Sequence, residues 1–262
     1  MGILVSFAAG IFPMLIYAWF LYYLDRYEKE PLPLLIGVFC WGAFVAAGVA
    51  YLINSLSSIG LYVITQSEFA TQLTVSAFVA PVVEETLKGA AVFLVYLLYR
   101  SEFDSPLDGL VYGGITALGF AATENIWYIH QLGYLQSGWQ GLLDMSIVRV
   151  FLVGWQHPFY TAFIGLGFAI ARRVNTPLGK WLSPIIGWVI AVGFHLIHNL
   201  FAIMLGSTTG RLFASIWDWS GYIGLMLLIF LLIKREQRWM RDFLASELEN
   251  GLITENPVSY TH

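Results

Sequence analysis

Long apolar stretches separated by short polar connections run along the chain from its first residues to about residue 233. A helix that crosses the hydrocarbon core of a membrane needs about 20 mostly apolar residues. The pattern predicts seven such helices, over residues 3–24, 34–55, 73–99, 108–131, 147–170, 181–205 and 213–233. We expect the first to be a retained span rather than a cleavable signal, because no basic segment precedes it. The longest connections on the outer side are expected at 56–72 and 132–146.

The composition is typical of a chain that lies mostly in lipid. Of its 262 residues, 58% are hydrophobic and 11% are charged, whereas a soluble domain carries about 25% charged residues. A net charge of -4 without any long basic block argues against a nucleic-acid partner, and a single cysteine, Cys40, excludes a disulfide scaffold. The sequence therefore predicts an all-α, polytopic transmembrane helical bundle.

The distribution of Lys and Arg sets the expected orientation, because cytoplasmic loops carry an excess of these residues. With the N-terminus outside, the inner segments carry ten basic residues and the outer segments carry only Arg211. This bias predicts an odd number of spans and a cytoplasmic C-terminus. We expect one seven-span domain over residues 1–233, followed by a cytoplasmic tail over residues 234–262. Part of that tail is expected to be an amphipathic helix on membrane lipid, or else a solvated extension of the last span.

Four predicted spans carry ionisable or strongly polar residues, which are costly inside a membrane and usually face a protein interior or a hydrated cavity. They are Glu84, Glu85 and Lys88 in the third span, Glu124 in the fourth, His157 in the fifth, and His195 and Asn199 in the sixth. Counted from the outer end of each span, the acids, the histidines and Asn199 lie roughly 9–18 Å deep at about 1.5 Å per residue. The shared depth predicts that these side chains meet in one layer.

Helical spacing refines the expected layer. Glu84 and Lys88 are four residues apart and can pair, whereas Glu85 points about 100° away from Glu84. We expect Arg149 to pair instead with Asp144 near the membrane interface. A carboxylate beside imidazoles can accept a proton from water, and two imidazoles with a carboxylate can also supply three ligands of an open zinc site. The residues leave both chemistries open, beside the alternative that each polar group is only a structural hydrogen-bonding partner.

The segments that carry these residues resemble those of the PrsW intramembrane proteases. The resemblance runs over most of the chain, in order, and rests on Asp25–Pro31, Glu84–Lys88, Phe103–Gly113, Gly119–Ile126, His157–Thr161 and His195–Asn199. It implies a multi-pass peptidase of a bacterial cell membrane with Glu84 and Glu85 as the catalytic glutamate motif. It further implies that His157 and His195 are catalytic or ligand histidines, and that Glu124 and Asn199 complete the site. PrsW proteases are associated with the first cleavage of a membrane-anchored anti-sigma factor outside the cytoplasm.

We therefore expect an endopeptidase that hydrolyses a single-span, membrane-anchored protein, of which an anti-sigma factor is the candidate type, near the outer side of the membrane. Glu84 or Glu85 would activate water, and His157, His195 or Asn199 would stabilise the oxyanion. The sequence contains no HExxH motif and favours metal-free catalysis; if zinc is bound, its expected ligands are His157, His195 and Glu85. The alternatives are a proton-coupled transporter, because buried acids and histidines also build proton relays, and a non-catalytic membrane scaffold.

Overall fold

Helices form the whole of the described architecture. The computed structural model describes residues 1–25, 28–204 and 208–249, and no strand occurs among them. The predicted all-helical class is therefore confirmed. Arg26 and Tyr27 of the inner loop, and positions 250–262 of the predicted tail, lie outside the described residues.

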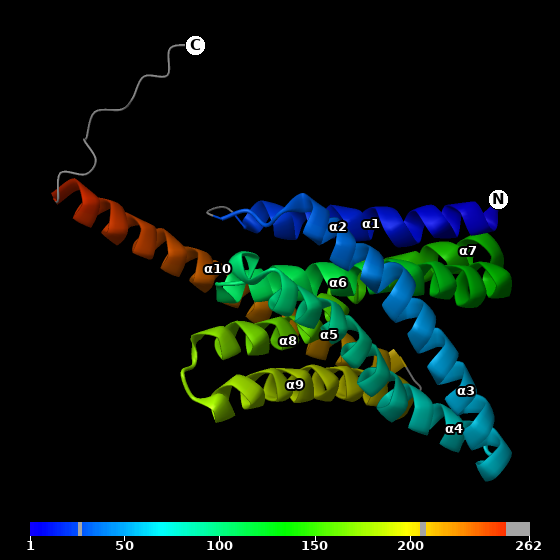
Figure 1. Ribbon diagram of the computed structural model, residues 1–262. Helices are drawn as coiled ribbons and strands as arrows, with labels where there is room; N and C mark the ends of the chain where they lie inside the picture. Colours follow the sequence, from blue (N-terminus) through cyan, green and yellow to red (C-terminus); the bar gives the residue numbers. More distant parts are fainter. Residues whose placement is uncertain (26–27, 205–207, 250–262) are drawn as a thin grey trace.

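The helices succeed one another with short connections (Figure 1). After α1 come two rods, α2–η1–α3 and α4–η2–α5, and then the helices from α6 to α10. The elements are α1 (Gly2–Leu24), α2 (Leu32–Cys40), η1 (Trp41–Ala46), α3 (Ala47–Thr65), α4 (Glu68–Thr74), η2 (Val75–Val79), α5 (Ala80–Leu98), η3 (Arg100–Glu102), α6 (Pro106–Trp127), η4 (Tyr128–Tyr134), α7 (Leu135–Ser146), η5 (Ile147–Leu152), α8 (Gln156–Arg173), α9 (Pro177–Met204) and α10 (Thr208–Glu249). The segments η1, η2, η4 and η5 are π-helical and continue the α-helices beside them.

Helix α6 occupies the centre of the bundle. In Figure 1, α1, α6, α8 and α9 lie roughly parallel in successive layers, and the α2–α3 and α4–α5 rods run obliquely across them. Every residue of α6 from Leu107 to Ala122 is buried. The helix is therefore surrounded by protein, which places the polar end of α6 inside the bundle.

Glycines let α6 approach its neighbours at backbone distance. A Cβ atom at Gly109 would overlap the carbonyl group of Gly165 in α8. A Cβ atom at Gly119 would likewise overlap the carbonyl oxygen of Phe39 in α2. Small residues have this role in packed membrane helices, because they allow two backbones to touch. The close crossings fix where α6 and α8 deliver their side chains.

The start of α6 is fixed by its cap. The Ser105 hydroxyl accepts hydrogen bonds from the backbone N–H groups of Leu107 and Asp108, and the Asp108 carboxylate accepts one from the Ser105 N–H. Pro106 occupies the first helical position, where its missing N–H costs nothing. This reciprocal arrangement is a capping box, which the sequence Ser-Pro-Leu-Asp provides locally.

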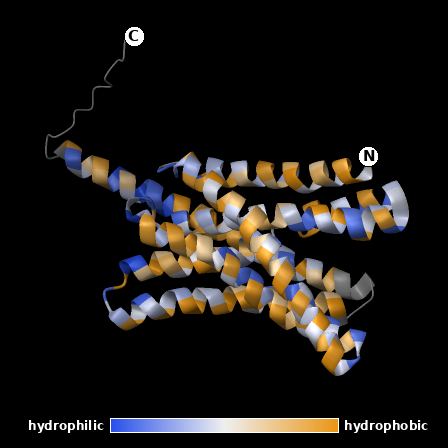
Figure 2. Ribbon diagram, turned by 45° about the vertical axis from the view of Figure 1, so that its right-hand side comes forward, coloured by the Kyte–Doolittle hydropathy of each residue, from blue (hydrophilic) through white to orange (hydrophobic). Residues whose placement is uncertain are grey.

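Among the described residues, four helices are long and apolar enough to cross a membrane: Gly2–Leu24, Leu32–Thr65, Pro177–Ile203 and Leu212–Leu248. Large apolar side chains such as Phe44, Ile64 and Trp181 are exposed on them by 74%, 80% and 74%, and much of the ribbon in Figure 2 has the colour of hydrophobic residues. Lipid explains this exposure where water would not. Helices α5, α6 and α8, at the predicted third to fifth spans, are not among the four. The molecule is a membrane protein, and the count of seven spans and the orientation stay predictions.

Two segments that were expected to be connections are helical in the structure, and so is the chain around the expected domain boundary. The segments predicted as connections at 56–72 and 132–146 are largely helical, in α3, α4, η4 and α7. Helix α10 passes through residue 233 without a break, so the described part of the predicted tail is a direct continuation of the last helix (Figure 1). The division into residues 1–233 and 234–262 stays a prediction.

Candidate active site

Five of the six predicted site residues lie together where α5, α6, α8 and α9 meet. Glu84 and Glu85 come from α5, Glu124 from α6, His157 from α8 and His195 from α9. The exposed fractions of Glu84, Glu85, His157 and His195 are 6%, 0%, 2% and 3%. The ring centroids of the two histidines are 5.2 Å apart. Residues more than 100 positions apart in the sequence thus form one buried polar cluster.

Irregular helix turns lie beside three of these residues. The π-helical segment η2 ends at Val79, shortly before Glu84, and η5 ends at Leu152, shortly before His157. The segment η4 begins at Tyr128, just after Glu124. A π-helical turn changes the direction in which the following side chains point, and such turns occur frequently at functional sites. The turns η2 and η5 thus help α5 and α8 to direct Glu84 and His157 toward one point.

The predicted fifth span is interrupted next to His157. After η5, the chain leaves helical geometry at Val153 and resumes it at Gln156, so that His157 lies in the first turn of α8. Val153 and Gly154 are buried. Irregular backbone at membrane depth is tolerated only where protein or a hydrated cavity surrounds it. The break therefore supports an internal polar chamber at this level.

Three neighbouring side chains contact the Glu85 carboxylate. Its Oε1 atom lies 2.6 Å from Lys88 Nζ and 3.0 Å from His195 Nδ1, and its Oε2 atom accepts a 2.8 Å hydrogen bond from the Thr161 hydroxyl. All these groups are buried. Side chains of the cluster thus take three of the roughly four acceptor positions of this carboxylate, which is the arrangement of a group that orients its neighbours.

Glu84 is held far more loosely. Its Oε1 atom accepts only a long 3.5 Å contact from the Asn54 amide, and its Oε2 atom is buried without a hydrogen bond among the described residues. That oxygen faces His195 Nε2 at 3.8 Å and Lys88 Nζ at 3.9 Å. A buried acceptor without a partner is costly, and such groups in native proteins often mark catalytic or ligand-binding positions.

The contacts of His195 assign its tautomer. Its Nδ1 atom faces the Glu85 carboxylate, which can only accept, so Nδ1 carries the proton. The Nε2 atom is then an acceptor, and it faces Glu84 Oε2, which is an acceptor as well. Two acceptors that face each other at 3.8 Å require a cation, a proton or a water molecule between them.

His157 forms a second pair of the same kind. Its Nε2 atom lies 2.9 Å from the Glu124 carboxylate, and its Nδ1 atom lies 3.2 Å from Lys88 Nζ. Glu124 is itself held by the Arg149 guanidinium, which also donates a 2.9 Å hydrogen bond to the Asn125 side chain. The site therefore contains two carboxylate–imidazole pairs, with Lys88 between them.

The charges in the cluster do not balance. Glu85 pairs with Lys88, and Glu124 pairs with Arg149. Glu84 is the third carboxylate, and its nearest cation, Lys88, already belongs to Glu85. The site thus has one carboxylate in excess, which makes it receptive to a further positive charge.

Asn199, the sixth predicted residue, lies elsewhere. Its amide donates a 2.6 Å hydrogen bond to the backbone carbonyl of Ser76 in η2, and among the described residues it forms no hydrogen bond with the acids or with His157. The structure places it at the edge of the cluster, one helical turn from His195, where it joins α9 to the α4–α5 rod.

Arg149 and Asp218 are two residues whose contacts the sequence did not indicate. The expected pair between Arg149 and Asp144 does not form, because Asp144 accepts a hydrogen bond from Gln140 and Arg149 turns to Glu124. Asp218 in α10 is buried and accepts a 2.7 Å hydrogen bond from the hydroxyl of Tyr160. A charged residue inside a predicted span is the signal that could have found Asp218.

Asp218 and Tyr160 support His195. The ring of Tyr160 is stacked on that of His195, with 5.1 Å between centroids and 25° between planes. The other carboxylate oxygen of Asp218 lies 2.8 Å from His198 Nδ1, although the angle is poor for a hydrogen bond. Helix α10 is thereby linked to the site through the Tyr160 ring.

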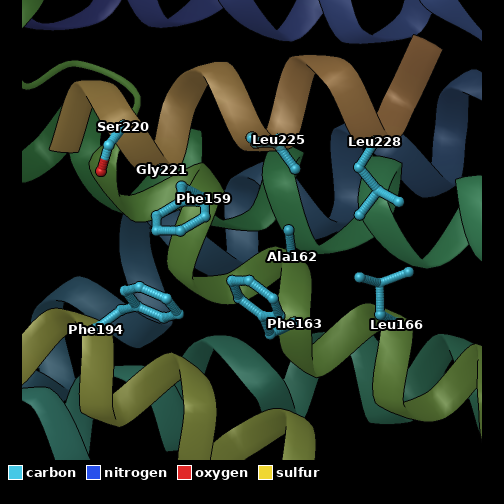
Figure 3. A pocket seen from close by; sticks show the side chains of 10 residues that line it. Phe159, Ala162, Phe163, Leu166, Phe194, Ser220, Gly221, Leu225 and Leu228 are labelled. Carbon is cyan, nitrogen blue, oxygen red and sulfur yellow. The ribbon is translucent and has the colours of Figure 1, made fainter. Parts of the chain in front are cut away.

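An apolar cavity of about 360 Å³ lies beside the cluster, between α8, α9 and α10. Figure 3 shows the Phe159 ring next to Gly221 of α10, with the rings of Phe163 and Phe194 across the cavity from that helix. None of the residues that line it carries a titratable side chain. The cavity has no group for acid–base chemistry, so the candidate active site is the buried cluster and not this space.

The cluster fits a bound metal ion. One ligand atom from each of Glu84, His157 and His195 lies within 4.8 Å of the others. Two imidazoles and a carboxylate form a common catalytic zinc set, and carboxylates that accept from the outer imidazole N–H, here Glu85 and Glu124, are typical of such sites. The sequence placed Glu85 in the ligand set, whereas the geometry groups Glu84 with the histidines.

Comparison with known proteins identifies the family. Residues 30–234 match the family described as PrsW family intramembrane metalloprotease. The chain belongs to the PrsW family. All five clustered residues lie in the matched region of this PrsW family member.

Curated relatives named Protease PrsW support the assignment. The chain is 28% identical to that of Geobacillus kaustophilus over 63% of its own length, and 36% identical to that of Clostridioides difficile over 47%. The matched regions span 66% and 50% of those two proteins, less than two thirds of each. The relative from Bacillus subtilis is 27% identical, over 67% of this chain and 73% of its own. No solved structure matches the chain.

Proposed function

We propose that this chain is an intramembrane endopeptidase that hydrolyses a peptide bond of a membrane-anchored protein. The observation that carries the proposal is the free Oε2 atom of Glu84, which faces His195 Nε2 at 3.8 Å inside a buried cluster. Membership of the PrsW family supports the class of reaction. A single-span protein is the proposed substrate, and an anti-sigma factor is its candidate type.

The proposed arrangement in the membrane has seven spans, with the N-terminus outside and the C-terminus in the cytoplasm. The ten-to-one distribution of basic residues in the connections supports it. In this orientation the cluster lies in the outer half of the bacterial plasma membrane. Residues 1–233 would form the peptidase domain, and the cytoplasmic tail would begin as an extension of α10.

In the proposed reaction, Glu84 Oε2 accepts a proton from a water molecule as the water oxygen attacks the scissile carbonyl carbon. The C–N bond then breaks, and the leaving nitrogen takes the proton from Glu84. Glu85 and Glu124 hold the two imidazoles in fixed orientations through their N–H groups. Lys88 Nζ, 3.9 Å from Glu84 Oε2, is the nearest cation to the developing oxyanion.

If a metal ion is bound instead, Glu84, His157 and His195 would hold it, and Glu84 would then be a ligand and not the general base. A zinc ion held there would lower the pKa of its water and polarise the scissile carbonyl. Lys88 lies beside His157 Nδ1, so its ammonium group would have to move away from that nitrogen for the imidazole to bind a metal.

The substrate must be locally unwound. A helix hides its carbonyl groups in its own hydrogen bonds, so a peptide bond within a transmembrane helix is not open to attack. The near-complete burial of Glu84 and His195 also requires an opening between helices before a substrate enters. A segment at the end of a span meets both conditions more easily than one at its centre.

The test is cleavage of a single-span reporter by the full-length chain purified in detergent. We expect Glu84→Gln and His195→Ala each to reduce the cleavage rate at least a hundredfold, the usual scale for removal of a general base. Asp144→Asn is the matched control, because it makes the same acid-to-amide change at an exposed position. Cleavage by Glu84→Gln at the wild-type rate would reject the proposal, and reporter uptake into vesicles without cleavage would favour a transporter.

A further inference from the structure

A groove of about 500 Å³ lies between α3 and the α4–η2 segment. Its volume is within the range of about 300–1,000 Å³ that is usual for binding clefts. Most of its lining surface is apolar, and polar groups interrupt it. The lining residues are Ser58, Ile59, Tyr62 and Val63 on one side and Glu68, Thr71, Gln72 and Ser76 on the other. Figure 1 shows the α3–α4 end of the two rods projecting away from the other helices.

The inner end of the groove borders the active-site cluster. The carbonyl group of Ser76 accepts the hydrogen bond of Asn199, which is one turn from His195. On the opposite wall, Asn54 is one turn from Ser58 and contacts Glu84 Oε1 at 3.5 Å. Ser76 precedes Glu84 by eight residues, or about 12 Å along a helix. A segment lying in the groove would therefore lead directly to Glu84.

Glu68 is the sole charged residue between Glu30 and Glu84 in the sequence. Its exposed carboxylate forms no hydrogen bond or ion pair with any residue that the structure describes. An acid at the start of a helix complements the helix dipole, but Ser67 already caps α4 through the Ala70 N–H. An unpaired negative charge in an otherwise uncharged hairpin is the groove's most specific feature.

We propose that this groove binds the extended segment of the substrate next to the cleaved bond, and that Glu68 recognises a Lys or Arg side chain in it. The inference rests on the proposed peptidase function. An unwound segment presents backbone N–H and C=O groups, and the side chains of Ser58, Tyr62 and Gln72 have no partner among the described residues and are available to them. In the proposed orientation this hairpin end lies at the outer membrane surface, where an unpaired carboxylate attracts a cationic side chain and repels an acidic one.

A charge exchange between enzyme and reporter tests the proposal. Two single-span reporters would differ only in carrying Lys or Glu in the segment outside the span. With the wild type, we expect a KM for the Lys reporter about fivefold below that for the Glu reporter, with kcat similar, as for one partly exposed ion pair. Glu68→Lys should reverse this preference. The matched control is Glu102→Lys, which makes the same charge change at the opposite end of the α4–α5 rod.

The outcomes separate the two proposals. If Glu68→Lys weakens cleavage of both reporters equally, the residue serves the hairpin and not the substrate, and the inference is overturned. If Glu68→Lys changes KM for neither reporter, the inference is overturned too. It is also overturned if, in lipid vesicles, the change in KM follows the charge of the lipid headgroups and not the charge of the reporter. If the wild type cleaves neither reporter, the peptidase function itself fails.

Discussion

Replacement of Glu84 and of Glu85 by glutamine should affect cleavage and stability differently. Glu84→Gln alters a carboxylate whose Oε2 has no hydrogen bond, so little structure depends on it. Glu85→Gln breaks a buried ion pair with Lys88 at 2.6 Å and weakens the contacts to His195 and Thr161. We expect both variants to lose cleavage, and only the second to lose stability.

The contacts give the magnitudes. Removing one partner of a buried ion pair costs about 3–5 kcal/mol, because the other charge is left uncompensated. For a chain of this size, about 3 °C of Tm corresponds to 1 kcal/mol, so Glu85→Gln should lower Tm by roughly 10 °C. Glu84→Gln leaves the Lys88–Glu85 pair intact and should change the free energy of unfolding by less than about 1 kcal/mol.

The assay combines two measurements on the same purified samples. Tryptophan fluorescence during heating gives Tm in detergent, and reporter cleavage gives kcat and KM. Lys88→Met serves as the partner variant, since it should destabilise by a similar amount to Glu85→Gln and the double variant should recover part of the loss. Equal effects of Glu84→Gln and Glu85→Gln on Tm would refute the division of roles between them.

Three other perturbations test separate parts of the molecule. Cleavage by the proposed metal-free reaction should survive chelator dialysis; loss of cleavage that zinc restores, with bound zinc measured by elemental analysis falling in His157→Ala, would instead make Glu84, His157 and His195 metal ligands. Tyr160→Phe removes the hydrogen bond to Asp218 but keeps the ring on His195, so kcat should fall about fivefold with KM unchanged in a cleavage assay. Burial, with the charges of Asp108 and Asp25, raises the pKa of Glu30 to about 9. The folded state then binds the proton of the Glu30 carboxyl more tightly than the unfolded state does. Tm should therefore fall as the pH rises from about 5 to 9, and it should fall less in Glu30→Gln.

The sequence could predict the all-helical class and could predict that the acids and histidines lie close together. Apolar stretches of about 20 residues mark the helices, and ionisable residues at one depth have a physical reason to meet, because lipid cannot solvate them. The structure brings Glu84, Glu85, Glu124, His157 and His195 together in this way. The capping box at Ser105 depends only on neighbouring residues, so it too can be recognised in the sequence.

The sequence could not predict how the contacts in the cluster are divided between Glu84 and Glu85. Whether Glu84 or Glu85 is free depends on where Lys88, Thr161 and His195 point, and these come from three helices whose rotations the sequence does not specify. The π-helical turns add to the difficulty, since each changes the phase that a regular helix would predict. Arg149 lies within such a segment, η5, and contacts Glu124 where the sequence suggested Asp144.

The excess carboxylate separates a functional site from a structural network. A cluster that served packing alone would be complete with Glu85 and Lys88, and with Glu124 and Arg149, because these two pairs satisfy one another. Glu84 adds a third buried carboxylate and leaves one of its oxygens without a hydrogen bond, which costs folding free energy and contributes nothing to packing. The cost is recovered only when a proton, a metal ion or a water molecule occupies the space between Glu84 and His195. In the proposed reaction, the same imbalance that weakens the folded state supplies the position at which a water molecule is activated.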